Sequence, residues 1–151
     1  MLRSRLNDAL KEAMKGQDKR GVATIRLIMA ALKDRDIAAR GRGDGEGPGD
    51  DAILEMLQKM VKQRRESIAA YEKGKRDDLV QQEQEEIDVI SRFLPQMMDE
   101  EETAAAVEAA MQELKADSIK DMGRVMATLK ERFPGKMDFA KASGMVKKRL
   151  A

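Results

Sequence analysis

The sequence of 151 residues contains no cysteine, no histidine and no tryptophan, and its other aromatic residues are one tyrosine and three phenylalanines. Without cysteine and histidine, the chain can form neither a disulfide nor a zinc site built on those ligands. A thiol nucleophile and a Ser-His-Asp triad are excluded for the same reason. Any chemistry on this chain would have to use carboxylates, lysines or hydroxyl groups.

Long apolar runs are missing as well. No segment approaches the roughly 20 apolar residues that cross a bilayer, and residues 1–5 lack the apolar region of a signal peptide. We therefore expect a cytoplasmic protein that makes no contact with a membrane. Hydrophobic residues make up 42% of the chain and charged residues 38%, which suits a small core beneath a heavily charged surface.

Apolar residues recur three or four positions apart along almost the whole chain, which predicts an all-α protein. We expect a bundle of about four helices in residues 1–95 and a three-helix subdomain in residues 96–151. Pro95, after which the composition changes, marks the boundary. Five glycines in residues 41–49 predict a flexible loop, because this segment cannot bury enough surface to offset its backbone entropy.

The expected third and fourth helices, residues 50–73 and 77–94, form an antiparallel hairpin because only a short glycine-containing turn separates them. A polar residue interrupts each apolar stripe: Arg64 in one helix, and Glu83 and Glu86 in the other. We expect a partly buried Arg64–Glu86 or Arg64–Glu83 ion pair that sets the register of the hairpin. The alternative is a pair of carboxylates for acid–base catalysis, which the neighbouring arginine opposes because it keeps carboxylates ionised.

The net charge of +1 hides a strong segregation along the chain. Residues 1–42 hold 11 Lys and Arg against 5 Asp and Glu, and residues 118–151 hold 9 against 3, whereas residues 77–102 hold 1 against 10. Blocks of this size can steer a charged partner toward the protein. The alternative interpretation is that they are solvated faces that balance one another.

The C-terminal basic block is the candidate working surface. Lys141 and Lys148 lie seven residues apart and so share one helix face. Gly123 and Gly144 would allow a ligand to approach the backbone, or else permit tight helix crossings. All four aromatic residues lie on apolar stripes, so base stacking is not expected and an RNA partner would be recognised by its folded shape and charge. The candidate RNA-binding residues are Lys120, Gly123, Arg124, Lys136, Lys141, Lys147, Lys148 and Arg149.

Two separated motifs resemble those of the GatB/YqeY family. The first is KQRRESI at residues 62–68, continued by YEKGKRDDL at residues 71–79. The second is DMGRVM at residues 121–126, followed by FPGKMD at residues 133–138. The resemblance covers nearly the whole chain except the Gly-rich insert. The sequence departs from the commoner form of the tail in having Met137 before Asp138 and Phe139 after it, where a small residue is usual.

The resemblance implies a small two-part helical protein related to the C-terminal end of the GatB subunit of the glutamine-dependent aspartyl/glutamyl-tRNA amidotransferase. That end helps to hold the tRNA body, while the catalytic machinery of the enzyme lies outside the shared region. We therefore expect a non-catalytic tRNA-binding or tRNA-amidation accessory protein that needs no cofactor and no metal. By position, the resemblance assigns tRNA contacts to Gly123, Arg124, Lys136, Lys141, Lys147 and Lys148.

Two other functions stay open at this stage. The acidic segment at residues 77–102 could dock a basic protein, which would make the chain a protein-interaction module. The family label also implies a carbon–nitrogen ligase with glutamine as the amido-nitrogen donor, which would make the chain an enzyme of amide transfer.

Overall fold

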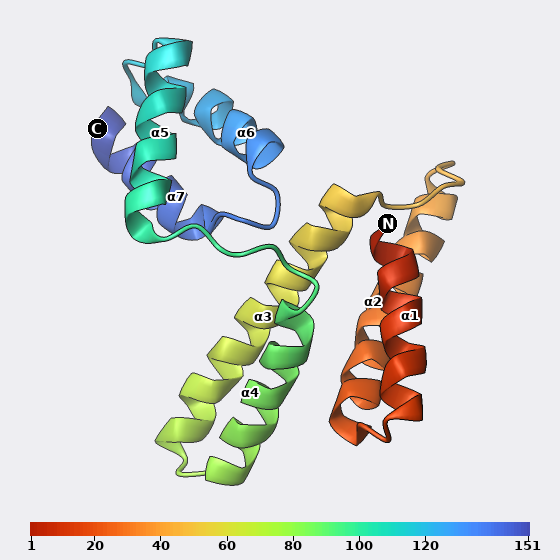
Figure 1. Ribbon diagram of the computed structural model, residues 1–151. Helices are drawn as coiled ribbons and strands as arrows, with labels where there is room; N and C mark the ends of the chain where they lie inside the picture. The colour runs from red at the N-terminus through yellow and green to blue at the C-terminus, as the bar shows by residue number, and fades with distance from the viewer. The chain divides into compact units, whose positions relative to one another are not determined.

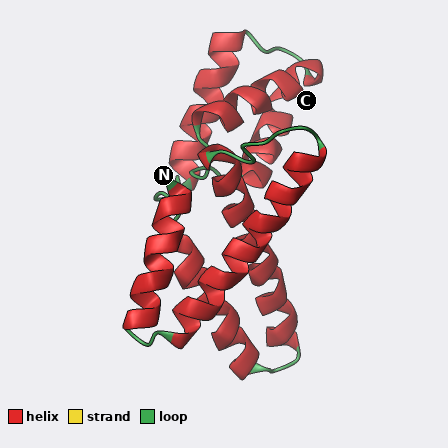
Figure 2. Ribbon diagram, turned by 90° about the vertical axis from the view of Figure 1, so that its right-hand side faces the viewer, coloured by secondary structure: helices red, strands yellow, loops and turns green.

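The computed structural model describes all 151 residues, and every regular element in it is a helix (Figure 2). The prediction of an all-α protein is confirmed. The helices group into two compact units, Met1–Leu94 (unit 1) and Pro95–Ala151 (unit 2). The elements are α1 (Leu2–Lys15), α2 (Lys19–Gly41), α3 (Asp50–Lys73), α4 (Asp77–Ser91), α5 (Glu100–Leu114), the short 3-10 helix η1 (Ile119–Asp121), α6 (Met122–Arg132) and α7 (Phe139–Leu150).

Unit 1 consists of α1 to α4, in which α3 and α4 run side by side as an antiparallel hairpin (Figure 1). The turn between them places Lys75 in the left-handed region, with φ of 56°. All four helices contribute side chains to one apolar core, which burial removes from water. The most deeply buried of these are Leu6, Ile28, Ile53, Leu57 and Ile90, each no more than 1% exposed.

The start of α2 is set by a local cap. Asp18 precedes the helix, and its carboxylate accepts a hydrogen bond of 3.0 Å from the backbone N–H of Gly21. Such a cap satisfies one of the N–H groups that a helix leaves unpaired at its first turn. A β-carbon at Gly21 would collide with the Asp18 carboxylate. A larger residue at this position would therefore require the Asp18 side chain to shift from its present position in the cap.

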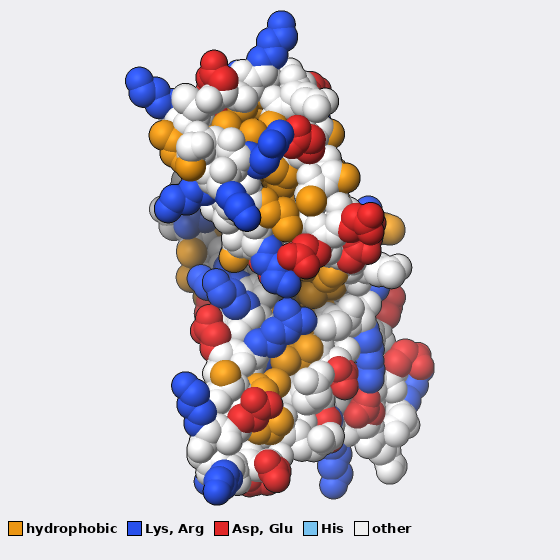
Figure 3. Space-filling model, turned by 90° about the vertical axis from the view of Figure 1, so that its left-hand side faces the viewer, with side chains coloured by type: hydrophobic (Ala, Val, Ile, Leu, Met, Phe, Trp, Pro, Cys, Tyr) orange, Lys and Arg blue, Asp and Glu red, His pale blue; other side chains and the backbone are white.

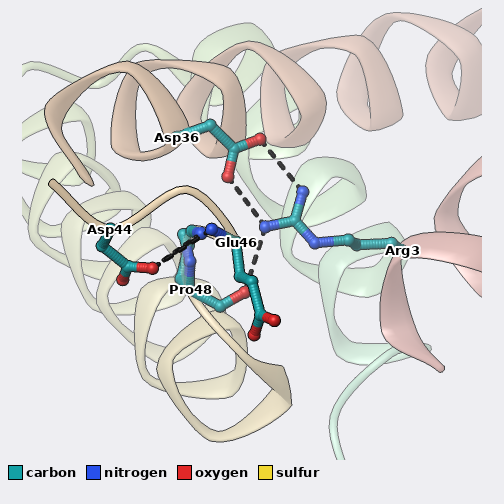
Figure 4. A network of polar contacts seen from close by, with 6 residues as sticks. Arg3, Asp36, Asp44, Glu46 and Pro48 are labelled. Atoms are coloured by element: carbon teal, nitrogen blue, oxygen red, sulfur yellow. Dashed lines mark hydrogen bonds and ion pairs between the residues drawn. The ribbon is translucent and has the colours of Figure 1, made fainter. Parts of the chain in front are cut away.

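The glycine-rich segment after α2 has a hydrogen-bonded turn, and Gly41, its first expected residue, is the last residue of the helix. Asp44 accepts hydrogen bonds from the backbone of Glu46 and of Gly47, whose φ of 74° lies in the left-handed region. Arg3 of α1 donates to the carbonyl oxygen of Pro48 at 3.0 Å (Figure 4). The segment is thus tied to α1 by a contact that its composition does not reveal.

Unit 2 consists of α5, η1, α6 and α7 around a second apolar core. Asp99 and Glu102 form a capping box at the start of α5. The short helix η1 comes directly before α6, and Ser118 and Asp121 form a second capping box at its start. Helix α6 itself begins at Met122. The most deeply buried core residues are Val107, Val125, Leu129, Met137 and Val146, each no more than 2% exposed.

Met137, where the sequence departs from the commoner family tail, is 0% exposed. It follows Gly135, whose φ of 74° turns the chain between α6 and α7. The backbone carbonyl of the adjacent Lys136 accepts a hydrogen bond of 2.7 Å from the N–H of Met98. The connection before α7 is therefore anchored by an apolar side chain and by a backbone contact to the segment preceding α5.

Candidate nucleic-acid interface

Helix α7 has two sharply different faces. Ala142, Val146 and Leu150 follow one another at intervals of four residues and are buried in the core of unit 2. The opposite face exposes a set of residues that contains three lysines and no acid. We call this set the lysine face of α7, and it consists of Ala140, Lys141, Gly144, Lys147 and Lys148. Cationic side chains that stand away from the surface are visible on the face of the molecule drawn in Figure 3.

None of the ion pairs of the chain involves a lysine, because each uses an arginine or the N-terminal amine. The five candidate lysines are all exposed and form no ion pair, and they are Lys120, Lys136, Lys141, Lys147 and Lys148. An exposed ammonium group without a partner can bind an external phosphate without first breaking an internal contact.

The two candidate arginines are engaged within unit 2. Arg149 pairs with Glu108 of α5 at 2.6 Å. Arg124 pairs with Asp121 at 3.1 Å and donates to the carbonyl oxygen of Leu114 at 3.0 Å. The pKa of Asp121 is lowered, chiefly by hydrogen bonds from the backbone of Asp117 and Ser118 and also by the charge of Arg124. Both arginines therefore hold helices of the protein together.

Gly123 and Gly144 do not mark tight helix crossings. Both residues are exposed, and a β-carbon added to either would meet no atom within 4 Å. The interpretation that close packing requires these glycines is therefore wrong. A glycine within a helix costs about 1 kcal/mol relative to alanine, and no contact inside the protein offsets that cost here.

Replacing Gly144 by alanine should therefore raise the free energy of unfolding by about 0.5–1 kcal/mol, because alanine restricts the unfolded backbone and suits a helix better. Urea denaturation followed by circular dichroism measures this change. Ala140→Gly on the same exposed face is the matched reverse substitution and should lower stability by a similar amount. A destabilised Gly144→Ala variant would mean that the position is crowded.

The structure brings Arg64 and Glu86 together in the α3–α4 hairpin, with Arg64 Nε 3.5 Å from Glu86 Oε2. The Arg64 side chain is 15% exposed and the Glu86 side chain 9%. Arg64 also donates from Nη1 to the carbonyl oxygen of Met60, its own helix neighbour, at 3.2 Å. The guanidinium group is therefore held by both helices.

Glu83 lies in the same cluster and behaves differently from Glu86. Its pKa is raised, first by burial and then by the negative charge of Glu86, and Arg64 opposes the rise only in part. The charge of Arg64 therefore does not hold the pKa of Glu83 at or below its ordinary value. A raised carboxyl pKa is what a general acid needs, but Glu86 and Arg64 are largely buried between two packed helices. The cluster therefore offers a substrate little access.

Some of the ten acids in the segment at residues 77–102 have partners within the chain. Glu85 pairs with Arg20 at 3.0 Å, Asp78 pairs with Arg76 at 3.0 Å, and Glu86 pairs with Arg64. The carboxylates of Asp99 and Glu102 close the capping box of α5. Ion pairs therefore balance three of the ten acids, and Asp77, Glu100 and Glu101 remain exposed without a cationic partner.

Features that would suit other kinds of ligand are few. No group of three or more Asp and Glu side chains is placed so that it could hold a metal ion. None of the helices combines the length and the apolar character that crossing a membrane would need. The three phenylalanines pack against the cores, Phe93 in unit 1 and Phe133 and Phe139 in unit 2. They therefore do not form a platform for stacked bases.

Comparison with known proteins identifies the family. The model of the family described as Yqey-like protein matches residues 3–150. The chain belongs to the YqeY-like family. This match confirms the resemblance to YqeY-like proteins that the two sequence motifs indicated, and it covers almost the full length of the chain.

Similar proteins of the YqeY-like family occur in yeasts, and those found are named altered inheritance of mitochondria protein 41, mitochondrial. The Saccharomyces cerevisiae protein (strain YJM789) is 35% identical over 94 residues, which is 62% of this chain and 49% of the relative. The Eremothecium gossypii protein is 38% identical over 114 residues, or 74% of this chain and 60% of the relative. The chain thus spans about half the length of the curated relatives it matches.

These relatives contradict the expectation of a cytoplasmic protein, because their names place them in mitochondria. The physical reason for the error is clear. Segments that direct proteins into mitochondria are amphipathic and rich in arginine, and they have no long apolar region. The absence of an apolar signal peptide therefore does not argue against a mitochondrial member of the YqeY-like family.

A further set of exposed cations lies on α2 of unit 1 and was not among the sequence candidates. Its members follow one another at intervals of seven residues, a spacing that is visible in the sequence, and they are Lys19, Arg26, Lys33 and Arg40. They were missed because the candidate residues were taken from the C-terminal basic block alone.

Proposed function

We propose that the chain is a non-catalytic accessory protein that binds folded tRNA through the phosphate backbone. The observation that carries the proposal is the lysine face of α7. Lys141, Lys147 and Lys148 are exposed there, form no ion pair, and share the face with no acidic residue. Such a face attracts phosphate through charge and does not read bases.

The surroundings of the lysine face support the same function. Gly144 lies in the middle of the face with open space beside it, so a phosphate group could approach the helix backbone closely. Lys120 and Lys136 add exposed cations in the same unit. Arg124 and Arg149 have a supporting role in this proposal, because their contacts to Asp121 and Glu108 hold α6 and α7 in place.

The chemistry of the chain also favours binding over catalysis. There is no cysteine or histidine to act as a nucleophile or base. In the hairpin, the side chains of Arg64 and Glu86 are largely buried, which limits the access of a substrate to them. Glutamine hydrolysis or ammonia-dependent amide transfer by the purified chain would overturn the non-catalytic part of the proposal.

The double charge reversal Lys141→Glu/Lys148→Glu tests the binding part. We expect the wild-type chain to shift total tRNA in an electrophoretic assay and to lose affinity steeply as salt rises, because each phosphate contact releases counterions. The double variant removes two contacts and adds repulsion, so its dissociation constant at low salt should rise at least about tenfold.

The matched control is Lys59→Glu/Lys62→Glu on α3. This variant makes the same change in net charge on an exposed face that also carries Glu55 and Glu66, and it should bind tRNA nearly as the wild type does. Equal losses in the two variants would show that only net charge matters. Absence of wild-type binding at low salt would remove the proposal altogether.

A further inference from the structure

Helix α2 carries a straight row of cations on its exposed side. Ile28 and Leu32 on the opposite side are buried in the core of unit 1, which fixes the orientation of the helix. The residues of the row follow one another at intervals of seven, and every one of them is exposed. We call this set the α2 row, and it consists of Lys19, Arg26, Lys33 and Arg40.

The geometry of an α-helix makes the row long and nearly straight. With a rise of 1.5 Å per residue, successive members lie about 10.5 Å apart along the axis and the row extends over about 31 Å. An interval of seven residues drifts by only about 20° around the helix. The length of the α2 row is close to the rise of one turn of a DNA duplex, about 34 Å.

No member of the α2 row takes part in an ion pair. The nearby Asp36 is already engaged, because Arg3 binds both of its carboxylate oxygens at 2.7 and 3.0 Å (Figure 4). This contact lowers the pKa of Asp36 and keeps it ionised and paired with Arg3. The charge of Arg40 also contributes to this lowering, so Asp36 balances this member of the row in part. The other three cations of the row take part in no ion pair within the protein.

The row also borders a depression between α1 and α2. The depression has a volume of about 490 Å³, and Arg26 and Lys33 line it together with Arg3 and Asn7 of α1. Side chains from two helices thus surround a hollow whose charged lining is three cations and one carboxylate, Asp36. A phosphate group of a polymer that follows the row could enter this hollow.

We propose that the α2 row is a second polyanion site, which binds the phosphate backbone of a nucleic-acid duplex independently of base sequence. The site lies in unit 1 and does not rest on the tRNA function proposed for the lysine face of α7. Four cations spread over about 31 Å can neutralise several phosphates of one duplex, since a duplex carries a negative charge about every 1.7 Å of its length. The side chains bind as point charges, so the site selects charge and shape and not sequence.

The same helix face suits a membrane surface less well. A helix that lies on a bilayer needs a continuous apolar stripe next to its cations. The large exposed apolar residues of α2 are Leu27 and Ile37, which lie ten positions apart with the exposed Asp34 between them. The row of charge is continuous along the helix, whereas the apolar surface is interrupted.

The test uses the full chain, a fluorescently labelled 20-base-pair DNA duplex and anisotropy titrations across a salt series. In the Lys141→Glu/Lys148→Glu background, duplex affinity should remain measurable at low salt. Adding Arg26→Gln/Lys33→Gln should raise the dissociation constant at least about tenfold. The fall of the logarithm of the association constant with the logarithm of the salt concentration should also become less steep, by about 0.9 for each lost phosphate contact. Adding Lys59→Gln/Lys62→Gln, which makes the same change in charge on α3, should have an effect smaller than about twofold.

Three outcomes would overturn the second site. One is a Lys141→Glu/Lys148→Glu chain without any duplex affinity at low salt. Another is an Arg26→Gln/Lys33→Gln variant that binds the duplex as well as the α3 control. The third is binding that depends on Arg26 and Lys33 only with phosphatidylserine vesicles and not with the duplex. Circular dichroism and urea midpoints should match among all variants, because every substituted side chain is exposed.

Discussion

Replacing Arg64 by alanine is expected to lower the free energy of unfolding by about 3 kcal/mol. Glu86 would then keep a charge in a largely buried position without its cationic partner, and an uncompensated buried charge is strongly destabilising. The double variant Arg64→Met/Glu86→Leu removes both charges and keeps the volume, so its stability should stay within about 1 kcal/mol of the wild type. Urea denaturation followed by circular dichroism gives both values.

Arg65→Ala is the matched control for the Arg64 substitution, because Arg65 is the next residue of α3 and is exposed. We expect it to change stability by less than about 0.5 kcal/mol. If Arg64→Ala were no worse than this control, the ion pair would contribute nothing and the register of the hairpin would depend on its apolar contacts alone.

Replacing Leu129 by alanine should remove a large part of the stability of unit 2. Leu129 is 0% exposed in the core of unit 2, and a buried leucine truncated to alanine costs about 2–5 kcal/mol. Unit 2 spans only Pro95–Ala151, and a unit of that size has about 3–9 kcal/mol of stability in total. Hydrogen exchange measured by mass spectrometry should therefore show rapid exchange in α5 to α7 and unchanged protection in α1 to α4.

The control for this substitution is Lys130→Ala, one position further along α6 and exposed. It should leave exchange in both units unchanged. The Leu129→Ala chain should also lose tRNA affinity that depends on the lysine face of α7, and keep the duplex affinity proposed for the α2 row. Equal loss of protection in α1 to α4 would mean that the two units unfold together.

Arginine and lysine have distinct roles in this protein. Apart from the N-terminal amine, every cationic partner in the ion pairs is an arginine, including those that join α1 to α2 and α5 to α7. The planar guanidinium group can bind a carboxylate through two hydrogen bonds, which favours arginine where a fixed internal contact is needed. Lysine carries a compact, strongly hydrated charge on a flexible stem, so it suits a surface that meets a mobile polyanion.

The prediction of helices succeeded because their signals are local. Asp18, Asp99 and Asp138 each cap a helix within a few residues, and apolar spacing reports the buried face of each segment. The position of Arg64 opposite Glu86 could also be worked out by counting residues from a short turn. The two motifs of the YqeY-like family are likewise short runs of neighbouring residues, and they pointed to the family before the comparison did.

Short-range signals along the chain are enough to define the helices, their caps, the hairpin register and the family. Which cations are available to a ligand depends on contacts between residues that are far apart in the sequence. Arg149 finds Glu108, which is 41 residues away, and Arg3 joins Asp36 and the carbonyl oxygen of Pro48. The fold also leaves open space beside Gly144. The physical reason is that spacing within one helix defines a face, whereas the neighbour of that face comes from a distant part of the chain.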